Sequence, residues 1–433
     1  MANKIVLVIG AGPFQLALVQ KASQLCDVIL AAPVISDDFK PYIADELLVD
    51  VRDFESILAF ADGGNRFGRR VDGVITDETD IPVYTVARVA EALGLPGIDP
   101  EVAHLFTNKS LMRSKMAELG IKVLPNKTVT SLEEATSFYD EISGTVIIKP
   151  VDAQGSRGVQ LCHSAEELEA KFAEAARWAT TSEVIVERYA TGREFVIEGL
   201  ALDFEFCNLC IGDTVYFDIE DSLSARERTF PTIAPDDLRD RALELNTQII
   251  KGFGLKQGIT HSEFVMEGDD IFLIETAARG GGAFISSDLI PLSCGLQSEE
   301  LLVKMALGEI ATFSDLGKLE HPLSVQSVDD LAINPLGHCC YVAFYIPSGE
   351  VKAISGVQEV LSLPYIHRTQ IEHLEDLVGS GYDEGQSDKT SRYLITIEAP
   401  TREELERRMS LVRSTIQADV LSPEGTIAHL IWY

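Results

Sequence analysis

An acid, a cation and a run of glycines follow one another in the stretch FLIETAARGGG, from Phe272 to Gly282. An apolar run ends at the carboxylate of Glu275 and is followed by the guanidinium of Arg279. A guanidinium can stabilise charge on a moving phosphoryl group, and it can clamp a carboxylate through two hydrogen bonds. The stretch ends in glycines whose bare backbone would let N–H groups approach a substrate carboxylate: Gly280, Gly281 and Gly282. We therefore expect an anionic ligand here.

A second acid, Glu263, precedes Glu275 in ITHSEFVMEGDDIFLIETAAR, which has the pattern of two strands and a turn. A three-residue turn at 268–270 pairs Glu267 with Ile271 and places Glu263 opposite Glu275, about 5 Å away. A turn of two or four residues would put the acids on opposite faces. Facing carboxylates repel, and Mg²⁺, with Mn²⁺ as an alternative, would remove the conflict. The competing interpretation is a pair of acids held by salt bridges or water. His261 shares this face and would touch substrate or a metal-bound water, or be a core histidine.

The stretch TVIIKPVDAQGSRGVQL places a lysine, Lys149, at the end of a buried strand and before a loop of small residues. Backbone N–H groups in such a loop, with a lysine beside them, suit phosphate. The loop residues concerned are Gly155, Ser156 and Gly158. The chain contains no GxxxxGK[ST] motif, so this is not a P-loop. By itself the loop is also compatible with an ordinary turn.

The stretch VIVERYATGREFVIEG can serve a nucleoside. One strand ends at Glu187, Arg188, Tyr189 and Ala190, and the next carries Glu194. A short connector can offer backbone groups to an adenine edge, and an acid can accept hydrogen bonds from ribose hydroxyls. Without other support, the same pattern indicates an ordinary hairpin.

The first hundred residues alternate strand and helix patterns, which predicts a doubly wound α/β unit. KIVLVIG, DVILAAP and DGVITD have the pattern of buried parallel strands, and helical patterns cover 14–24, 54–60 and 81–93. The first turn, GAGPFQ, departs from the dinucleotide fingerprint because Gln15 replaces the third glycine and no acid ends the second strand.

Beyond this unit the sequence predicts α+β structure. Capping boxes begin helices at 132–142 and 165–179, in each case a serine followed three residues later by a glutamate: Ser131 with Glu134, and Ser164 with Glu167. A further helix is expected at 236–252 and a strand pair at 258–277. CCYVAFYIPSGEVKAI is expected to form a hairpin around 347–350. The expected domains are 1–107, 108–310 with a lid subdomain at about 125–190, and 311–433.

These pieces, in this order, resemble the ATP-grasp superfamily over nearly the whole chain. The order is Lys109 after the α/β unit, Lys149 with its glycine loop, VERY with GREF, the paired glutamates and then Arg279. GITHSEF, LIETAARGGG and ISGVQEVLSLPYI are most similar to carboxylate–amine ligases that include L-amino acid ligases. The resemblance implies a pre-ATP-grasp domain, a central ATP-grasp fold with a mobile lid, and a C-terminal domain like that of biotin carboxylases.

The same resemblance implies roles for single residues. Lys109 and Lys149 would hold ATP phosphates under the loop from Gly155 to Gly158. The segment 187–190 would face adenine, with Glu194 on the ribose. Glu263 and Glu275 would ligate Mg²⁺, and Arg279 would steady the γ-phosphoryl group and an acyl phosphate. Many members carry Asn two residues after the second acid, where this chain has Ala277.

Composition narrows the class of partner. The formal net charge of −32 argues against nucleic acid and anionic membranes. The seven scattered cysteines and the lack of a long apolar run indicate a cytoplasmic protein. We expect small carboxylate and amine substrates, amino acids among them, and a homodimer. In the stretch 218–237, Arg226 or Arg228 would bind a second carboxylate, or the stretch is a solvated loop.

Three alternatives stay open. A carboxylase acting on bicarbonate would share the superfamily, and a non-catalytic nucleotide-binding module would share the fold. The triplet HSE at 261–263 is similar to the H-x-E of zinc deaminases, but the P-C-x-x-C partner is missing. Cys207 and Cys210 have ligand spacing without a second pair.

Overall fold

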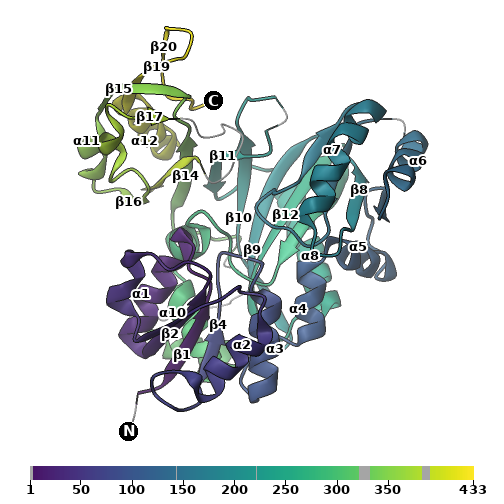
Figure 1. The fold of residues 1–433 in the computed structure, drawn as a ribbon, viewed down its shortest axis with the longest axis vertical. Helices are drawn as coiled ribbons and strands as arrows, with labels where there is room; N and C mark the ends of the chain where they lie inside the picture. The colour runs from purple at the N-terminus through teal and green to yellow at the C-terminus, as the bar shows by residue number, and fades with distance from the viewer. Residues whose placement is uncertain (1–2, 143, 221, 321–331, 383–390) are drawn as a thin grey trace.

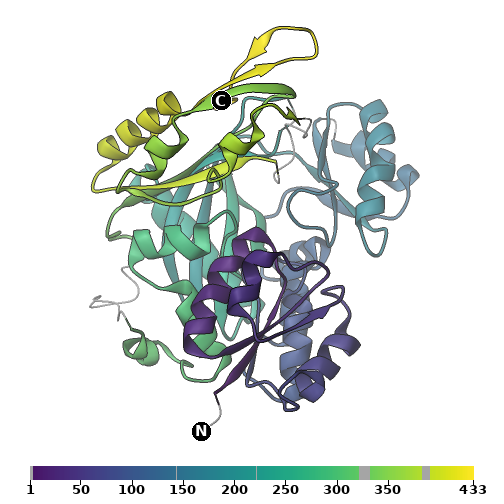
Figure 2. The ribbon, with the colours of Figure 1, turned by 60° about the vertical axis from the view of Figure 1, so that its left-hand side comes forward.

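The computed structural model describes residues 3–142, 144–220, 222–320, 332–382 and 391–433. A long central sheet runs through the molecule, with an N-terminal α/β unit below it, a small sheet with two helices at one side, and a C-terminal unit above (Figures 1 and 2). Within the described ranges no helix is both long and apolar enough to cross a bilayer.

The N-terminal unit has the predicted parallel sheet, in the order β3-β2-β1-β4. Its strands are β1 (Ile5–Ile9), β2 (Asp27–Ala32), β3 (Asp45–Leu48) and β4 (Gly73–Ile75). Its helices are η1 (Pro13–Gln15), α1 (Leu16–Leu25), η2 (Asp37–Tyr42), α2 (Phe54–Ala59), η3 (Phe60–Gly64), α3 (Val83–Leu93) and α4 (Pro100–Thr107). Strand β1 lies between β2 and β4, and its five residues, all apolar, are buried on both faces of the sheet. The segment 76–82, after β4, reaches the cavity described below.

The small sheet is antiparallel, in the order β5-β8-β6-β7, and follows α5 (Lys109–Glu118). Its strands are β5 (Asn126–Val129), β6 (Val146–Pro150), β7 (Gln160–Cys162) and β8 (Val184–Arg188). The helices α6 (Leu132–Ile142) and α7 (Ala165–Trp178) begin where the capping boxes predict them. Ser131 and Ser164 accept the backbone N–H groups of Glu134 and Glu167 at 3.3 and 3.2 Å. We refer to this unit as the lid sheet.

The central sheet has eight antiparallel strands in the order β13-β12-β9-β10-β11-β14-β18-β16. Its strands are β9 (Arg193–Leu202), β10 (Glu205–Tyr216), β11 (Ala225–Phe230), β12 (Gly258–Glu267), β13 (Asp270–Ala277), β14 (His338–Phe344), β16 (Ile366–Thr369) and β18 (Tyr393–Ala399). Accompanying helices are α8 (Asp236–Phe253), η4 (Ile285–Leu289), α9 (Ile290–Cys294), α10 (Ser298–Ala306) and η5 (Phe313–Lys318). Because strands from both sides of residue 310 share this sheet, a boundary there divides the chain but not the sheet.

The C-terminal unit adds a second small sheet, β17-β15-β19-β20. Its strands are β15 (Gly349–Ser355), β17 (Gly381–Tyr382), β19 (Gln417–Leu421) and β20 (Ile427–Ala428), and its helices are α11 (Val357–Leu361), η7 (Leu374–Leu377) and α12 (Arg402–Thr415). The hairpin expected around 347–350 is wrong. Strand β14 pairs with β11 and β18, whereas β15 pairs with β17 and β19. The chain passes between two sheets there, and long-range partners outcompete the local pairing.

Candidate active site

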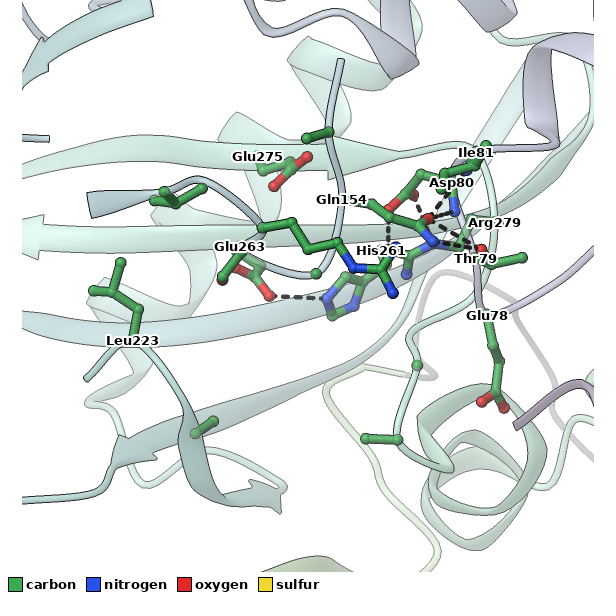
Figure 3. A pocket seen from close by; sticks show the side chains of 18 of the residues that line it. Glu78, Thr79, Asp80, Ile81, Gln154, Leu223, His261, Glu263, Glu275 and Arg279 are labelled. Atoms are coloured by element: carbon green, nitrogen blue, oxygen red, sulfur yellow. Dashed lines mark hydrogen bonds and ion pairs between the residues drawn. The ribbon is translucent and has the colours of Figure 1, made fainter. Parts of the chain in front are cut away.

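A cavity of about 600 Å³ lies where the N-terminal unit, the lid sheet and the central sheet meet. It falls within the size range of small-molecule sites. Its wall includes the segment 78–82, the loop 153–157, the connector 187–190 and side chains of β12 and β13. Figure 3 shows part of this wall, with the two glutamates on neighbouring strands and Arg279 beside Asp80. Most of the predicted site residues therefore face one space.

The two glutamates are paired across the hairpin, as predicted, but by a different route. Glu267 pairs with Asp270, so the turn has two residues and the expected pairing of 267 with 271 is wrong. A turn of that length would have put the acids on opposite faces. A β-bulge restores the register: Phe264 pairs with Leu273 and Glu263 with Glu275, which leaves Ile274 as the extra residue.

Each glutamate contacts a cation. Glu275 lies 2.9 Å from the Nζ atom of Lys109, and Glu263 pairs with Arg228. The side chain of Glu275 is 35% exposed and that of Glu263 is 23% exposed, so both are accessible from the cavity. The interpretation of the two acids as salt-bridged is thus correct for this structure. The two acids also lie opposite each other on neighbouring strands, as the metal hypothesis requires.

The acid pair fits a magnesium ion by the chemistry of its donors. Mg²⁺ commonly takes one or two carboxylates and completes its shell with water and phosphate oxygens. Among the described residues, no group of three or more His, Cys, Asp or Glu side chains is placed to hold a metal. Ala277, opposite His261, has no side-chain oxygen to offer. The two carboxylates supply the number and kind of protein donors that such an ion commonly takes.

His261 is buried in a chain of polar contacts. Its Nδ1 atom contacts Glu198, its Nε2 atom lies 3.2 Å from Glu263, and Arg228 lies 3.0 Å from the same nitrogen. Burial opposes a positive charge on the ring, but Glu198 more than offsets this and raises the pKa of His261. His261 is thus held by the protein on both sides, and Glu198 is a partner that the sequence did not indicate.

Lys149 and Glu187 form a buried cluster with Arg113 at the base of the lid sheet. The Nζ atom of Lys149 lies 2.9 Å from Glu187, and Arg113 donates to both oxygens of the same carboxylate at 2.6 and 3.2 Å. Burial opposes ionisation of Glu187, but Arg113 and Lys149 prevail and lower its pKa to about 2. The carboxylate of Glu187 is thus held by two protein cations.

Arg113 also ties this cluster to the bulge. Its Nη2 atom donates to the carbonyl oxygen of Ile274 at 2.6 Å. A bulge removes a residue from the ladder, so its backbone groups need other partners. Sequence reasoning missed Arg113 because a lone arginine in the helix 109–118 carries no motif.

The loop 152–158 closes over one side of the cavity. Gly155, Ser156 and Gly158 have positive φ angles of 64°, 61° and 70°. A Cβ atom on Gly158 would come within 3.0 Å of Trp178 and Pro150, so both its backbone angle and its surroundings require glycine. Lys109 donates to the carbonyl oxygen of Ala153 at 2.8 Å.

The connector after β8 leads from the lid sheet to the central sheet. The hairpin interpretation of this stretch is wrong, because β8 pairs with β5 and β6 while β9 pairs with β10 and β12. Arg188 pairs with Glu267 at 2.6 Å, and Tyr189 and Ala190 line the cavity. Glu194 accepts a hydrogen bond from Tyr216, and burial raises its pKa to about 7.

Arg279 is aimed by an acid from the N-terminal unit. Its Nε and Nη2 atoms donate to the two oxygens of Asp80 at 2.7 and 2.9 Å, and its Nη1 atom donates to the carbonyl of Gly280 at 2.8 Å. These contacts use three of the five N–H groups of a guanidinium. Burial opposes protonation of Arg279, but Asp80 outweighs it and raises the pKa, so the charge is permanent.

The glycines after Arg279 differ from the prediction. The N–H of Gly280 donates to Asp77 at 2.8 Å, and that of Gly281 donates to Glu198 at 3.1 Å, so neither is left for a substrate carboxylate. A Cβ atom on Gly280 would lie 2.2 Å from the Oγ atom of Ser286. These two glycines permit close packing against buried acids. Gly282 lines the cavity.

Arg226 is also misplaced by the prediction. It contacts Glu227 at 3.0 Å and lies over the ring of Tyr433, 5.0 Å from its centroid, away from the cavity. Residues two positions apart on a regular strand share a face. Here Arg226 is the extra residue of a bulge in the β10–β11 pairing, so Arg228 lines the cavity and Arg226 does not. Of the two arginines predicted to bind a second carboxylate, Arg228 is the one that lines the cavity.

Comparisons with known proteins find similar sequences and similar folds. Residues 142–288 match the family model for the ATP-grasp domain. The alanine–anticapsin ligase of Bacillus subtilis is 28% identical over 231 residues, which cover 48% of this chain and 48% of that ligase. The L-amino acid ligase of Bacillus licheniformis has a TM-score of 0.78 at 19% identity, covering 96% of this chain and 98% of that chain.

A carboxylase structure shares the fold as well. The biotin carboxylase domain of the 2-oxoglutarate carboxylase of Hydrogenobacter thermophilus has a TM-score of 0.69 at 16% identity, covering 99% of this chain and 92% of that chain. The matches in sequence span 60% and 48% of the length of the first curated relatives. Residues 142–288 are thus similar to the ATP-grasp domain, and enzymes of the ligase type are among the relatives of the chain.

Proposed function

We propose that this protein is an ATP-dependent carboxylate–amine ligase that forms an amide bond through an acyl phosphate and releases ADP and phosphate. The observation that carries the proposal is the meeting of Lys109, Lys149, the pair Glu263–Glu275 and Arg279 around one cavity. A carboxylate is a poor electrophile, so it must be activated before an amine can displace its oxygen. Phosphoryl transfer is catalysed mainly by positioning and by stabilisation of charge, and those are the groups that do both.

In the first step a carboxylate oxygen of the substrate forms a bond to the γ-phosphorus while the bond to the β-phosphate oxygen breaks. Lys109 and Lys149 would neutralise the phosphates, and the loop 152–158 would offer backbone N–H groups to them. The outward N–H groups of Arg279 would hold the transferred phosphoryl group. Asp80 keeps Arg279 in place during this step.

In the second step an amine nitrogen bonds to the acyl carbon, the carbon–oxygen bond to phosphate breaks, and the proton on nitrogen passes to the departing phosphate. Glu263 and Glu275 would hold Mg²⁺, which supplies charge stabilisation at the phosphate oxygens when bound. Lys109 and Arg228, which now pair with these acids, then become available to anions.

The nucleoside end of ATP would lie along the connector 187–190. The residues of this connector line the cavity, and Glu194 lines the same space. Ionised Glu194 would accept hydrogen bonds from ribose hydroxyls. Amino acids as both substrates are supported by the names of the two ligase relatives. A homodimer and the domain boundaries at 107 and 310 stay predictions.

Phosphate release with ATP and Mg²⁺ across a panel of amino acids and other carboxylates, with mass detection of products, tests the proposal. We expect release with pairs of amino acids, a product lighter than its two parts by one water, and ADP as the nucleotide product. A panel arm with bicarbonate tests a carboxylase, for which the shared fold with biotin carboxylase is the support. AMP as the product would refute the acyl-phosphate route.

Arg279→Ala gives a sharper test. Because arginines that contact the transferred phosphoryl group contribute roughly 10³-fold or more to turnover, we expect kcat to fall by at least about that factor. ATP binding, measured by calorimetry, is expected to change little because the lysines remain. Unchanged turnover would remove Arg279 from the chemistry.

A further inference from the structure

The side chain of Gln154 joins the glycine loop to the N-terminal unit. Its Oε1 atom accepts the backbone N–H groups of Asp80 and Ile81, the latter at 3.0 Å. Its Nε2 atom donates to the Oγ1 atom of Thr79 at 2.8 Å. The Thr79 hydroxyl lies near both ends of the amide, 3.0 Å from Oε1 and 2.8 Å from Nε2, so the two backbone donors are what identify Oε1 as the oxygen. Figure 3 shows Gln154 over this segment.

Asp80 connects these contacts to Arg279. Its backbone N–H is held by Gln154, and its carboxylate holds Arg279 through two hydrogen bonds. Movement of the backbone at Asp80 would therefore turn the carboxylate and the guanidinium attached to it. A chain of direct contacts thus runs from the loop to the cation that faces the phosphoryl group.

The segment that carries Asp80 depends on outside support. It is irregular between β4 and α3, and Glu78 has a φ angle of 56°, a left-handed conformation that costs a non-glycine residue roughly 1–2 kcal/mol. Strained backbone persists where its surroundings hold it. The amide of Gln154 supplies an acceptor for two successive N–H groups just beyond the strained residue.

The same loop is fixed at the preceding residue. Lys109 bridges the carbonyl oxygen of Ala153 and the carboxylate of Glu275, at 2.8 and 2.9 Å. Two successive residues of the loop thus contact two parts of the site: Ala153 is linked through Lys109 to Glu275, and Gln154 is linked through Asp80 to Arg279.

We propose that Gln154 is a positioning residue that couples closure of the loop 152–158 to the orientation of Arg279, through Asp80. When the loop leaves the phosphates, the N–H groups of Asp80 and Ile81 lose their acceptor. The carboxylate of Asp80 then no longer fixes the orientation of Arg279. The phosphoryl group is therefore met by a fixed guanidinium when the loop is closed over it. The kinetic part of this inference rests on the proposed function.

Hydrogen exchange tests the coupling without any turnover. In the unchanged protein we expect ATP with Mg²⁺ to slow exchange of the amides in 79–82 as well as in the loop. In Gln154→Ala the loop is still protected by the nucleotide, but the protection of 79–82 is lost. Equal protection of 79–82 in both proteins would overturn the coupling. Gln358→Ala, an exposed glutamine on α11, is the matched control and retains both effects.

Steady-state kinetics then show whether the loss of Gln154 affects turnover or ATP binding. We expect Gln154→Ala to lower kcat about tenfold or more, with KM for ATP within about threefold, since misplacing a catalytic group by about 1 Å costs on the order of a hundredfold. Gln154→Glu, which keeps the acceptor, recovers part of the loss. In an Asp80→Asn background the same alanine change lowers kcat by less than about threefold, because both changes act through one chain of contacts.

The contrary results are distinct. A loss of equal size in both backgrounds, or kcat within about twofold for Gln154→Ala, would overturn the coupling. If the unchanged protein shows no ATP-dependent turnover with any substrate pair, the ligase proposal fails, and the exchange experiment alone decides the role of Gln154.

Discussion

Two clusters of charge border the same cavity and differ in how their charges are matched. At the base of the lid sheet, the carboxylate of Glu187 is 1% exposed and receives both Arg113 and Lys149. On the hairpin, Glu275 is 35% exposed and pairs with Lys109, and Glu263 is 23% exposed and pairs with Arg228. Arg113 contacts both regions, through Glu187 and through the carbonyl of Ile274.

The two clusters are therefore expected to have different roles, one in holding the structure together and the other in changing partners. A buried, fully hydrogen-bonded pair is costly to open, so the Glu187 cluster is expected to hold the lid sheet against the hairpin in every state. In the hairpin pairs the cations are buried but the carboxylates are partly exposed to the cavity, so these pairs are expected to open at a lower cost and to change partner. Under the proposed function, the hairpin acids would exchange their lysine and arginine for a metal, and these cations would turn to the phosphates.

Glu275→Gln gives the largest expected effect and tests the exchange side of this comparison. We expect kcat/KM to fall by about a thousandfold, because a bound metal contributes several kcal/mol of charge stabilisation. The free energy of unfolding is expected to fall by less than in Arg113→Met, because the carboxylate removed is partly exposed and Lys109 keeps its hydrogen bond to Ala153. Steady-state kinetics and urea unfolding measure the two. Asp270→Asn, which removes an exposed acid of the same hairpin paired with Lys122, is the control and leaves both unchanged. A large loss of stability in Glu275→Gln would contradict the comparison.

Arg113→Met tests the structural side. Because it leaves Glu187 buried with one cation fewer, we expect a loss of about 3 kcal/mol in the free energy of unfolding. The double change Arg113→Met with Glu187→Gln is expected to recover part of this loss, since the uncompensated charge is gone. Urea unfolding followed by circular dichroism measures both. A loss under about 1 kcal/mol would show that the cluster is not what holds the lid sheet.

The pH dependence of ATP binding gives the smallest effect. Burial raises the pKa of Glu194 to about 7, so the free protein carries the neutral acid below that pH and the carboxylate above it. Binding to ribose hydroxyls favours the carboxylate, so affinity is expected to rise with pH, by about tenfold from pH 6 to 8. Calorimetric titration measures it, with Glu194→Gln at each pH as the control for other groups. An equal slope in that variant would assign the effect to other groups.

The pKa of Glu187 is shifted in the opposite direction, downward, and the contribution of Glu187 to stability is lost as pH falls from the ordinary glutamate range toward about 2.

Local pattern was sufficient for part of the fold and of the site. The capping serines Ser131 and Ser164 begin their helices as predicted, because a cap depends on residues three positions apart. The pairing of Glu263 with Glu275 was also predicted, but through a turn that the structure does not have. The bulge at Ile274 could not be read from the sequence, since its carbonyl is satisfied by Arg113, far away along the chain.

The missed residues share one property: each acts through a distant partner. Asp80 holds Arg279, Glu198 holds His261 and the N–H of Gly281, and Gln154 holds the backbone at Asp80. None has a neighbour in sequence that signals its role. For the same reason Gly280 was assigned to substrate, although Asp77 takes its N–H.

The sequence by itself determined the order of the charged groups along the chain and the local elements that carry them, because strands, caps and turns follow from short-range pattern. Tertiary structure decided which acids meet which cations, by bringing the segment 78–82, the lid sheet and the hairpin to one cavity. Electrostatic partnership depends on distance in space and on burial, and neither is encoded locally. Glu187 and Glu275 are both glutamates near the ends of strands, and their surroundings alone bury one between two cations and leave the other partly exposed to the cavity.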